Sequence, residues 1–392
     1  MIRLLAGLLL CASTMTAQRA TLSKGLEHFY NLEYDEAIAE FRRQIEAAPD
    51  QPSAHNHLAM AILYREMYRT GALETELVSG GNPFLRRPKM NPAPEDEKEF
   101  FTAIQRSMSR SQARLEKDPK DLQALYTLGV AHGLRANYNF LVRKAYMDSL
   151  RDATAARRLH NKVTDLDPSH YDARLVQGVH EYVVGSLPWH IRMLGFLVGF
   201  RGDKERGIRI LEEVAHKGRL NDVDAEVLLC AIYRRERNAA KAVPLLQDLI
   251  RRFPRNHLLR LELAQMYSDL GNKGAALAVL EEMEKLRAAG APGYARLPLE
   301  KILFARGVIQ FWYNDLDQAI ENLERVTAKT ELLDLNTESY AWLRLGQAYD
   351  LAGKRSLALQ AYRTLQQRAP GSDAANQARP FLSTPYQRRP SS

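Results

Sequence analysis

One segment of the chain has a spacing of large and small residues that fits a pair of packed helices. In residues 342–349, large side chains recur three or four positions apart and form one helical stripe that includes Gly346. A glycine there lets a second helix approach closely, and Gly353 suits the turn between the helices. Ala358 is small where the two helices would touch, and Pro370 ends the second helix. The segment therefore predicts a helix-turn-helix unit.

The same spacing recurs along most of the chain, and it resembles the tetratricopeptide repeat. The equivalent positions are Leu263, Ala264, Tyr267, Gly271, Ala276, Leu280 and Met283; Leu229, Cys230, Tyr233, Ala242, Leu246, Leu249 and Pro254; Gly307, Ala319, Leu323 and Val326; and Gly25, Ala37, Phe41 and Pro49. The first two of these units are related by the family step of about 34 residues. The resemblance implies an all-α fold, a right-handed α-solenoid of about eight helix-turn-helix repeats.

The repeats divide the chain into a longer, irregular part and a regular part. We expect a signal peptide at residues 1–17, repeats with three insertions at 18–222, regular repeats at 223–380 and a disordered tail at 381–392. Each insertion falls between the first and second helix of its repeat. Gly129 and Ala156 are 27 positions apart, for example, whereas Gly346 and Ala358 are 12 apart. Either lengthened helices or a loop can absorb such an excess.

The three insertions are expected to converge in space. Stacked repeats place equivalent turns along a single rim, so neighbouring insertions should meet there. The segments concerned are residues of about 71–100, 135–147 and 184–203. The first contains two Pro/Gly-rich runs and is expected to be a long irregular excursion.

The N-terminal residues have the ingredients of a secretory signal peptide. Arg3 is followed by a short apolar run from Leu4 to Leu10 and then by small and polar residues through Ala17. This predicts an exported protein, periplasmic or extracellular. Cys11 follows a leucine, which is a poor match to a lipoprotein signal, so a lipid anchor is not favoured.

Charge and motifs argue against several functional classes. The formal net charge is +8, but Lys and Arg alternate with Asp and Glu along many helical segments, which indicates solvated helix faces and not a nucleic-acid-binding stripe. His55 and His57 would diverge on a helix, and Cys230 occupies a small-residue packing position. No phosphate loop or nucleophile elbow is present. We therefore expect no cofactor, no metal, no nucleic-acid partner and no enzymatic activity.

The family resemblance implies a concave groove, lined by the first helices, in which a protein or peptide partner binds. Counting from the repeat positions, the groove-facing set includes Arg234, Arg235, Phe304, Val308, Phe311, Trp312, Tyr340, Gln347 and Asp350. Aromatic residues flanked by arginine are typical of peptide-binding hot spots. The alternative for these side chains is packing between repeats. The paired Lys and Asn of the carboxylate-clamp subfamily are missing from these positions.

Two functions remain open at this point. The first is a non-catalytic scaffold or adaptor that binds a partner protein through the groove or the insertion rim. The second is a peripheral, membrane-associated envelope assembly factor, whose membrane contact would be Trp189, Leu194, Phe196 and Phe200 in an unusually apolar segment. Packing of that segment over the repeats is the simpler interpretation. Residues 185–207 also resemble a segment of the fungal inclusion-body clearance family of helical-repeat proteins.

Overall fold

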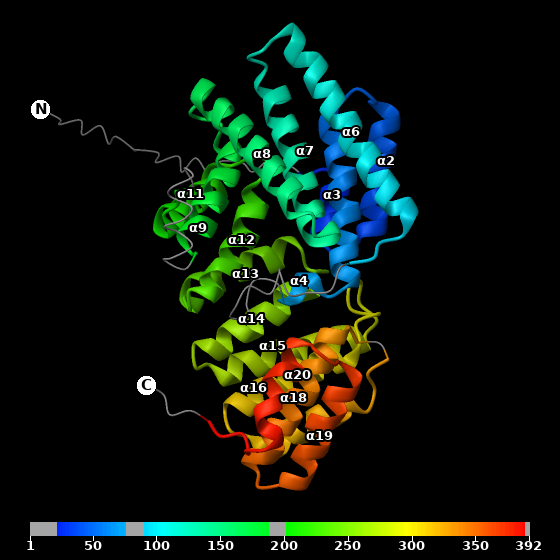
Figure 1. The fold of residues 1–392 in the computed structure, drawn as a ribbon, viewed down its shortest axis with the longest axis vertical. Helices are drawn as coiled ribbons and strands as arrows, with labels where there is room; N and C mark the ends of the chain where they lie inside the picture. Colours follow the sequence, from blue (N-terminus) through cyan, green and yellow to red (C-terminus); the bar gives the residue numbers. More distant parts are fainter. Residues whose placement is uncertain (1–21, 76–89, 188–200, 332, 389–392) are drawn as a thin grey trace, which may run out of the picture.

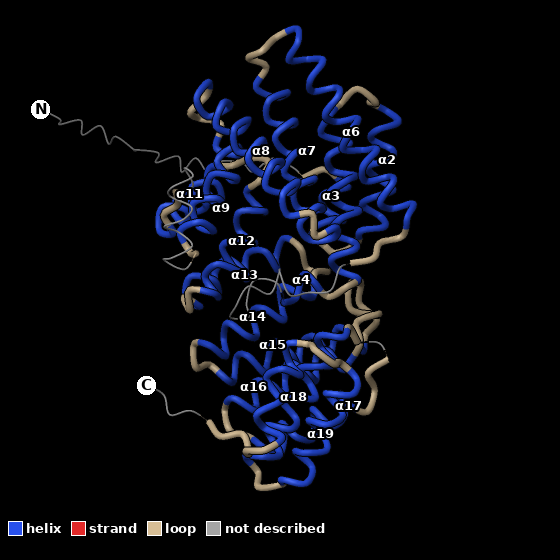
Figure 2. Tube along the Cα trace, viewed as in Figure 1, coloured by secondary structure: helices blue, strands red, loops and turns tan. Residues whose placement is uncertain are grey.

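The computed structural model describes residues 22–75, 90–187, 201–331 and 333–388, and within these ranges the regular structure is entirely helical (Figures 1 and 2). Sixteen helices form eight consecutive hairpins, as the repeat count predicted. The hairpins pair α1 (Lys24–Tyr30) with α2 (Tyr34–Ala47), α3 (Pro52–Arg69) with α6 (Pro94–Lys117), α7 (Leu122–Tyr138) with α8 (Tyr146–Leu166), α9 (Arg174–Gly185) with α11 (Lys204–Lys217), α12 (Asp222–Arg235) with α13 (Ala239–Arg252), α14 (His257–Asp269) with α15 (Lys273–Ala288), α16 (Leu299–Trp312) with α17 (Leu316–Thr327), and α18 (Leu335–Leu351) with α19 (Arg355–Arg368). A short helix, α20 (Asp373–Ala378), follows the last hairpin.

The repeat positions do the packing that the sequence predicted. A Cβ atom on Gly346 would lie 2.4 Å from the Tyr362 ring, so only glycine lets α19 approach α18 this closely. Ala358, at the same crossing, is fully buried. Between the paired helices, Gly353 adopts φ 72° and Gly271 adopts φ 78°, values that L side chains rarely take. The last hairpin is thus fixed by a tight turn and a close crossing, and Gly271 gives the hairpin of α14 and α15 the same kind of turn.

The second insertion is built into lengthened helices. α7 and α8 run for 17 and 21 residues and are joined through a π-helical turn, Asn139–Arg143. The first insertion holds the four-residue helix α4 (Ala72–Thr75) and leads into the 24-residue α6, while residues 76–89 lie outside the described ranges. Most of the third insertion, residues 188–200, also lies outside them.

The first two insertions meet, as expected for neighbouring turns on one rim. Arg143, at the end of the π-helical turn, pairs with Glu97 of α6. Its guanidinium also lies 3.9 Å from the centre of the Phe101 ring. Phe101 in turn contacts Tyr138 of α7, with ring centres 5.1 Å apart. Contacts of this kind join the first and second insertions, and convergence of the third with them stays a prediction.

The segment after α20 corrects the expectation of a disordered tail at 381–392. Residues 381–388 pack on the last two hairpins: the Phe381 ring lies 5.7 Å from that of Tyr362, and Tyr386 lies 6.1 Å from Phe311. Residues 389–392 are outside the described ranges. In Figure 1 the end of this segment runs beside α16.

Candidate interaction groove

A continuous groove of about 3060 Å³ runs along the first helices of the repeats. Its walls include side chains from α1, α3, α7, α9, α12, α14, α16 and α18, and its last lining residues belong to α20. The groove therefore extends from the first repeat to the last. This is the surface that the repeat pattern placed on the concave side of the solenoid.

The first repeat closes over part of this groove. The Tyr30 hydroxyl donates a hydrogen bond to Asp224 Oδ1 of α12 at 3.0 Å, and Asn256 Nδ2 donates to the Tyr30 carbonyl at 2.8 Å. The Arg255 guanidinium pairs with Glu33 at 2.7 Å and with Glu27 at 3.3 Å. We call this set of contacts between α1–α2 and residues 224–256 the clasp. These contacts join the first repeat to residues about 200 positions later in the chain. The clasp therefore turns an open groove into a partly enclosed one.

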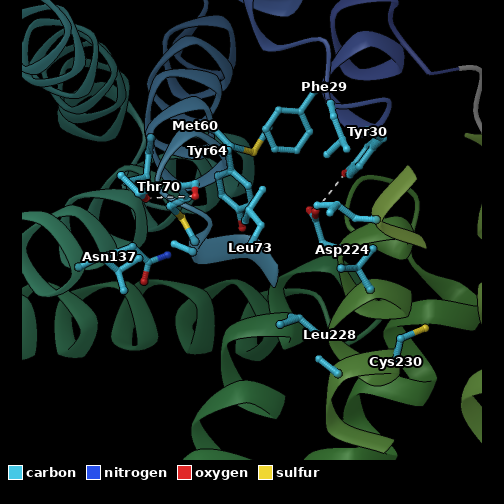
Figure 3. Close-up of a pocket in the computed structure, with 18 of the residues that line it drawn as sticks. Phe29, Tyr30, Met60, Tyr64, Thr70, Leu73, Asn137, Asp224, Leu228 and Cys230 are labelled. Carbon is cyan, nitrogen blue, oxygen red and sulfur yellow. Dashed lines mark hydrogen bonds between the residues drawn. The ribbon is translucent and has the colours of Figure 1, made fainter. Parts of the chain in front are cut away.

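Behind the clasp the groove is a largely apolar chamber (Figure 3). Met60 and Tyr64 of α3 and Leu73 of α4 line one side, and Leu228 and Cys230 of α12 line the other. Burial raises the pKa of the Cys230 thiol, with the carboxylates of Glu262 and Glu226 acting in the same direction. The thiol therefore stays protonated, as a packed side chain would, and lacks the thiolate character of a nucleophile.

Large apolar side chains remain exposed along the groove. Val183 of α9 is 51% exposed, Val227 of α12 is 42% exposed, and Leu335 at the start of α18 is 55% exposed. Leu220, which precedes α12, also lines the groove and is exposed. Exposed apolar side chains gathered on one concave surface mark a place where another molecule can be buried.

Cationic side chains outnumber anionic ones in the groove lining. The lining cations are Arg69, Arg219, Arg234, Arg235, Arg237, Lys301, Arg344 and Arg368, and the lining anions are Asp224, Glu262, Asp334 and Asp373. Four of the cations are already paired: Arg234 with Glu262 at 2.5 Å, Lys301 with Asp334 at 3.3 Å, and Arg69 and Arg368 with Glu66 and Glu338 outside the lining. The groove thus offers apolar contact with a surplus of positive charge.

The predicted partner-binding residues divide into three groups. Arg234, Arg235, Phe304, Val308 and Tyr340 line the groove. Phe311 and Gln347 are 0% and 3% exposed, and the Asp350 side chain is also fully buried, so the expectation that these residues face an open groove is corrected. Trp312 is 48% exposed at the end of α16, beside Phe311, outside the set that lines the groove. Trp189, Leu194, Phe196 and Phe200 lie outside the described residues.

Sequence reasoning missed the residues that close and line the N-terminal part of the groove. Tyr30, Asp224 and Arg255 form the clasp, and Val227 lies exposed beside it. The repeat pattern carries no signal for contacts between distant repeats. Val227 could have been predicted as a groove residue, because it lies on α12 three residues before Cys230, and Cys230 occupies the small-residue position of this repeat.

The partly buried carboxyl group of Asp224 in the clasp has a shifted pKa. Burial raises the pKa of Asp224 to about 6; the hydrogen bond from Tyr30 lowers it, and the carboxylates of Asp222 and Asp172 raise it further. In an unfolded chain the same group would titrate near its ordinary value of 3.8. The folded chain therefore binds this proton more tightly, and the contribution of Asp224 to stability declines as pH rises from about 4 to 6.

Replacing Asp224 by asparagine is expected to stabilise the protein at neutral pH. The amide oxygen can still accept the Tyr30 hydrogen bond, and the cost of a buried charge disappears. The gain in unfolding free energy should reach up to about 2 kcal/mol at pH 7.5 and vanish near pH 4. Urea unfolding of both proteins at the two pH values measures this. An equal effect at both would show that the charge of Asp224 is not its cause.

The described ranges hold neither a metal cluster nor a membrane-spanning helix. No group of three or more His, Cys, Asp or Glu side chains in these ranges is arranged to hold a metal ion. Among the helices of the same ranges, none combines the length and the apolar character that crossing a bilayer requires.

Comparisons with known proteins bear on the repeats. Residues 173–289 match the family described as Iml2/Tetratricopeptide repeat protein 39, and residues 340–372 match a tetratricopeptide-repeat family. The first match includes residues 185–207, the segment that resembles a fungal helical-repeat family. No curated protein matches the chain.

Several solved structures are similar to this chain at low sequence identity. The structure of the human IFIT1 dimer with m7Gppp-AAAA is 13% identical, with 92% of this chain and 80% of that one covered and a TM-score of 0.45. Yeast Tom70 is 12% identical, with 91% and 86% covered and a TM-score of 0.41. A tetratricopeptide-repeat protein from Parabacteroides merdae is 12% identical, with 81% and 96% covered and a TM-score of 0.30. The matched repeats and the eight helical hairpins of the described residues together show an all-α solenoid that contains tetratricopeptide repeats.

Proposed function

We propose that this chain is a non-catalytic scaffold that holds another protein in its groove, and that it does so in the periplasm or outside the cell. The observation that carries the proposal is the row of exposed apolar side chains, Val183, Leu220, Val227 and Leu335, on one concave surface. Leaving these side chains in water costs free energy that a bound segment would recover, at about 25 cal/mol for each Å² buried. Export rests on the signal-like residues 1–17 alone.

The charge of the groove narrows the class of partner. A segment that combines apolar side chains with Asp or Glu would satisfy both the exposed aliphatic residues and the surplus of arginine. Arg235 and Arg237 stand exposed at the end of α12, where an acidic side chain could reach them. The shape favours an extended segment or a helix over a large folded surface, because the clasp limits access from one side.

Site-specific photocrosslinking tests the proposal. A photoreactive residue at Val227 should crosslink a protein from the native envelope fraction, whereas one at Leu357 on α19 should not. Leu357 is the matched control for Val227, because Val227 is 42% exposed inside the groove and Leu357 is 40% exposed outside it. Equal crosslinking at both positions, or none at Val227, would contradict binding in the groove.

Peripheral membrane association remains the second candidate. It depends on the apolar residues Trp189, Leu194, Phe196 and Phe200. Flotation with liposomes that is lost in Leu194→Asp would support it. A scaffold that acts only through the groove should stay in the soluble fraction with or without that change.

A further inference from the structure

The last two repeats hold a segment of the same chain against the C-terminal ends of α16 and α18. The residues of α16 that line the groove, Phe304 and Val308, lie on one helical stripe with Phe311, at intervals of four and three positions. Phe311 is nevertheless fully buried, whereas Val308 is partly exposed. Phe311 packs in the core of the last two hairpins, and residues 381–388 add to its cover because they pass over the ends of α16 and α18. We call residues 381–388 the return segment.

Two side chains anchor the end of the return segment. The Tyr386 ring lies 6.1 Å from the Phe311 ring, and the Tyr386 backbone N–H donates to Asp350 Oδ2 at 2.8 Å. The Arg388 guanidinium stacks 5.3 Å from the Phe311 ring and donates hydrogen bonds to the carbonyl oxygens of Phe311 and Trp312. These carbonyls belong to the last turn of α16, where a cation also interacts favourably with the helix dipole.

The return segment begins with Phe381, whose ring packs against Tyr362 and whose carbonyl accepts a hydrogen bond from Arg355 at 2.8 Å; between Phe381 and Tyr386 it makes little contact. Residues 382–385 are exposed, and Gln387 is exposed between the two anchors. This inward–outward–inward alternation is that of an extended peptide lying on a surface. The anchors are an aromatic side chain and an arginine, the residue types that dominate peptide hot spots. By contrast α20 is fixed by Ala374, Ala375 and Ala378, which are all buried.

We infer that the surface formed by Phe311, Asp350 and the last turn of α16 is a binding site for an extended segment with the pattern aromatic–any residue–arginine, and that the return segment occupies it as a displaceable ligand within the chain. The Asp350 side chain is fully buried and is fixed in position by hydrogen bonds from Arg355 at 2.9 Å and from the Tyr362 hydroxyl at 2.9 Å. Its Oδ2 atom also accepts from the Tyr386 backbone, a contact that any peptide backbone can supply. A partner segment with the same pattern would compete with the return segment. That last step rests on the proposed scaffold function.

Binding of the segment from outside tests the site directly. The receptor is a chain that stops after Ser383, which keeps α20 and Phe381 and removes Tyr386 and Arg388. The probe is a fluorescently labelled peptide of residues 379–392, followed by fluorescence anisotropy. We expect saturable binding to the shortened chain and binding at least about tenfold weaker to the full chain, whose own segment fills the site.

Matched peptides make the result specific. Changing Arg388→Ala or Tyr386→Ala in the peptide should weaken binding at least about tenfold, whereas Gln387→Ala should leave it unchanged because that side chain faces away. Circular dichroism and thermal unfolding establish that the shortened chain is folded. The full-length Tyr386→Ala/Arg388→Ala variant provides a second receptor, and it should bind the unaltered peptide as the shortened chain does.

Two results would overturn the inference. One is a folded receptor, shortened or doubly substituted, that does not bind the peptide. The other is equal binding to these receptors and to the full chain. Neither result depends on the scaffold proposal, because no external partner is present. Conversely, peptide binding without any crosslinked protein at Val227 would leave the site established and the scaffold function contradicted.

Discussion

The Gly207→Ala variant is expected to lose about 3 kcal/mol of unfolding free energy, a large effect for the addition of a single methyl group. A Cβ atom at this position of α11 would lie 2.4 Å from the Tyr182 backbone nitrogen and 2.7 Å from the Gly178 carbonyl oxygen, both in α9. Backbone atoms cannot rotate away as a side chain can. The two helices would have to separate, and the fourth hairpin would lose its closest crossing.

Gly133→Ala is the matched control for this prediction. Gly133 lies inside α7, and a Cβ atom there would meet nothing within 4 Å. Alanine should therefore stabilise the helix by about 0.5–1 kcal/mol through its better helix propensity. Urea unfolding measures both changes. An array of repeats can unfold in parts, so hydrogen exchange would show which helices lose stability. In Gly207→Ala the loss of stability should begin in α9 and α11. Similar midpoints for the two variants would contradict the close crossing.

The hairpins could be predicted from the sequence because their decisive contacts are local. Gly346 and the ring of Tyr362 are 16 positions apart and meet in one hairpin, and the same spacing links Gly25 with Phe41. A fixed spacing within one hairpin repeats along the chain, so it is visible as a pattern. The count of about eight hairpins and the position of the second insertion followed from that spacing, whereas the choice between lengthened helices and a loop did not.

The candidate site could be predicted only in part, because its decisive contacts are not periodic. Tyr30 and Asp224 are 194 positions apart, and no regular spacing announces that the first repeat reaches the fifth. Phe311 and Gln347 occupy groove-facing repeat positions but are buried. Phe311 packs in the core of the last two hairpins and is covered in part by the return segment, which lies outside the repeats. A repeat pattern gives the direction of a side chain relative to its own helix, whereas exposure depends on what else lies there.

Among the charged residues of the clasp, Arg255 is the one on which closure of the groove should depend. Arg255 follows α13 and donates to Glu33 through Nε at 2.7 Å and through Nη2 at 3.1 Å, in addition to its ion pair with Glu27. Burial tends to raise the pKa of Glu33, but hydrogen bonds from Arg255 and His28 outweigh it and hold this pKa below its ordinary value. The ion pair is therefore complete at neutral pH, and it weakens only as pH falls through that lowered pKa.

The Arg255→Glu variant is expected to release the first repeat from the rest of the solenoid. The change removes the bidentate pair and places a third carboxylate beside Glu27 and Glu33, so local opening should become easier by about 3 kcal/mol, or roughly a hundredfold in hydrogen exchange. The increase should be confined to α1 and α2 and to the facing residues 222–257. Arg251→Glu is the matched control, because Arg251 lies in the last turn of α13 but is exposed and pairs with Asp248, three positions away on the same helix. Faster exchange in both variants, or in neither, would mean that Arg255 does not hold the groove closed. Faster exchange in Arg255→Glu alone, with stronger crosslinking from Val227, would show that the clasp controls entry to the groove.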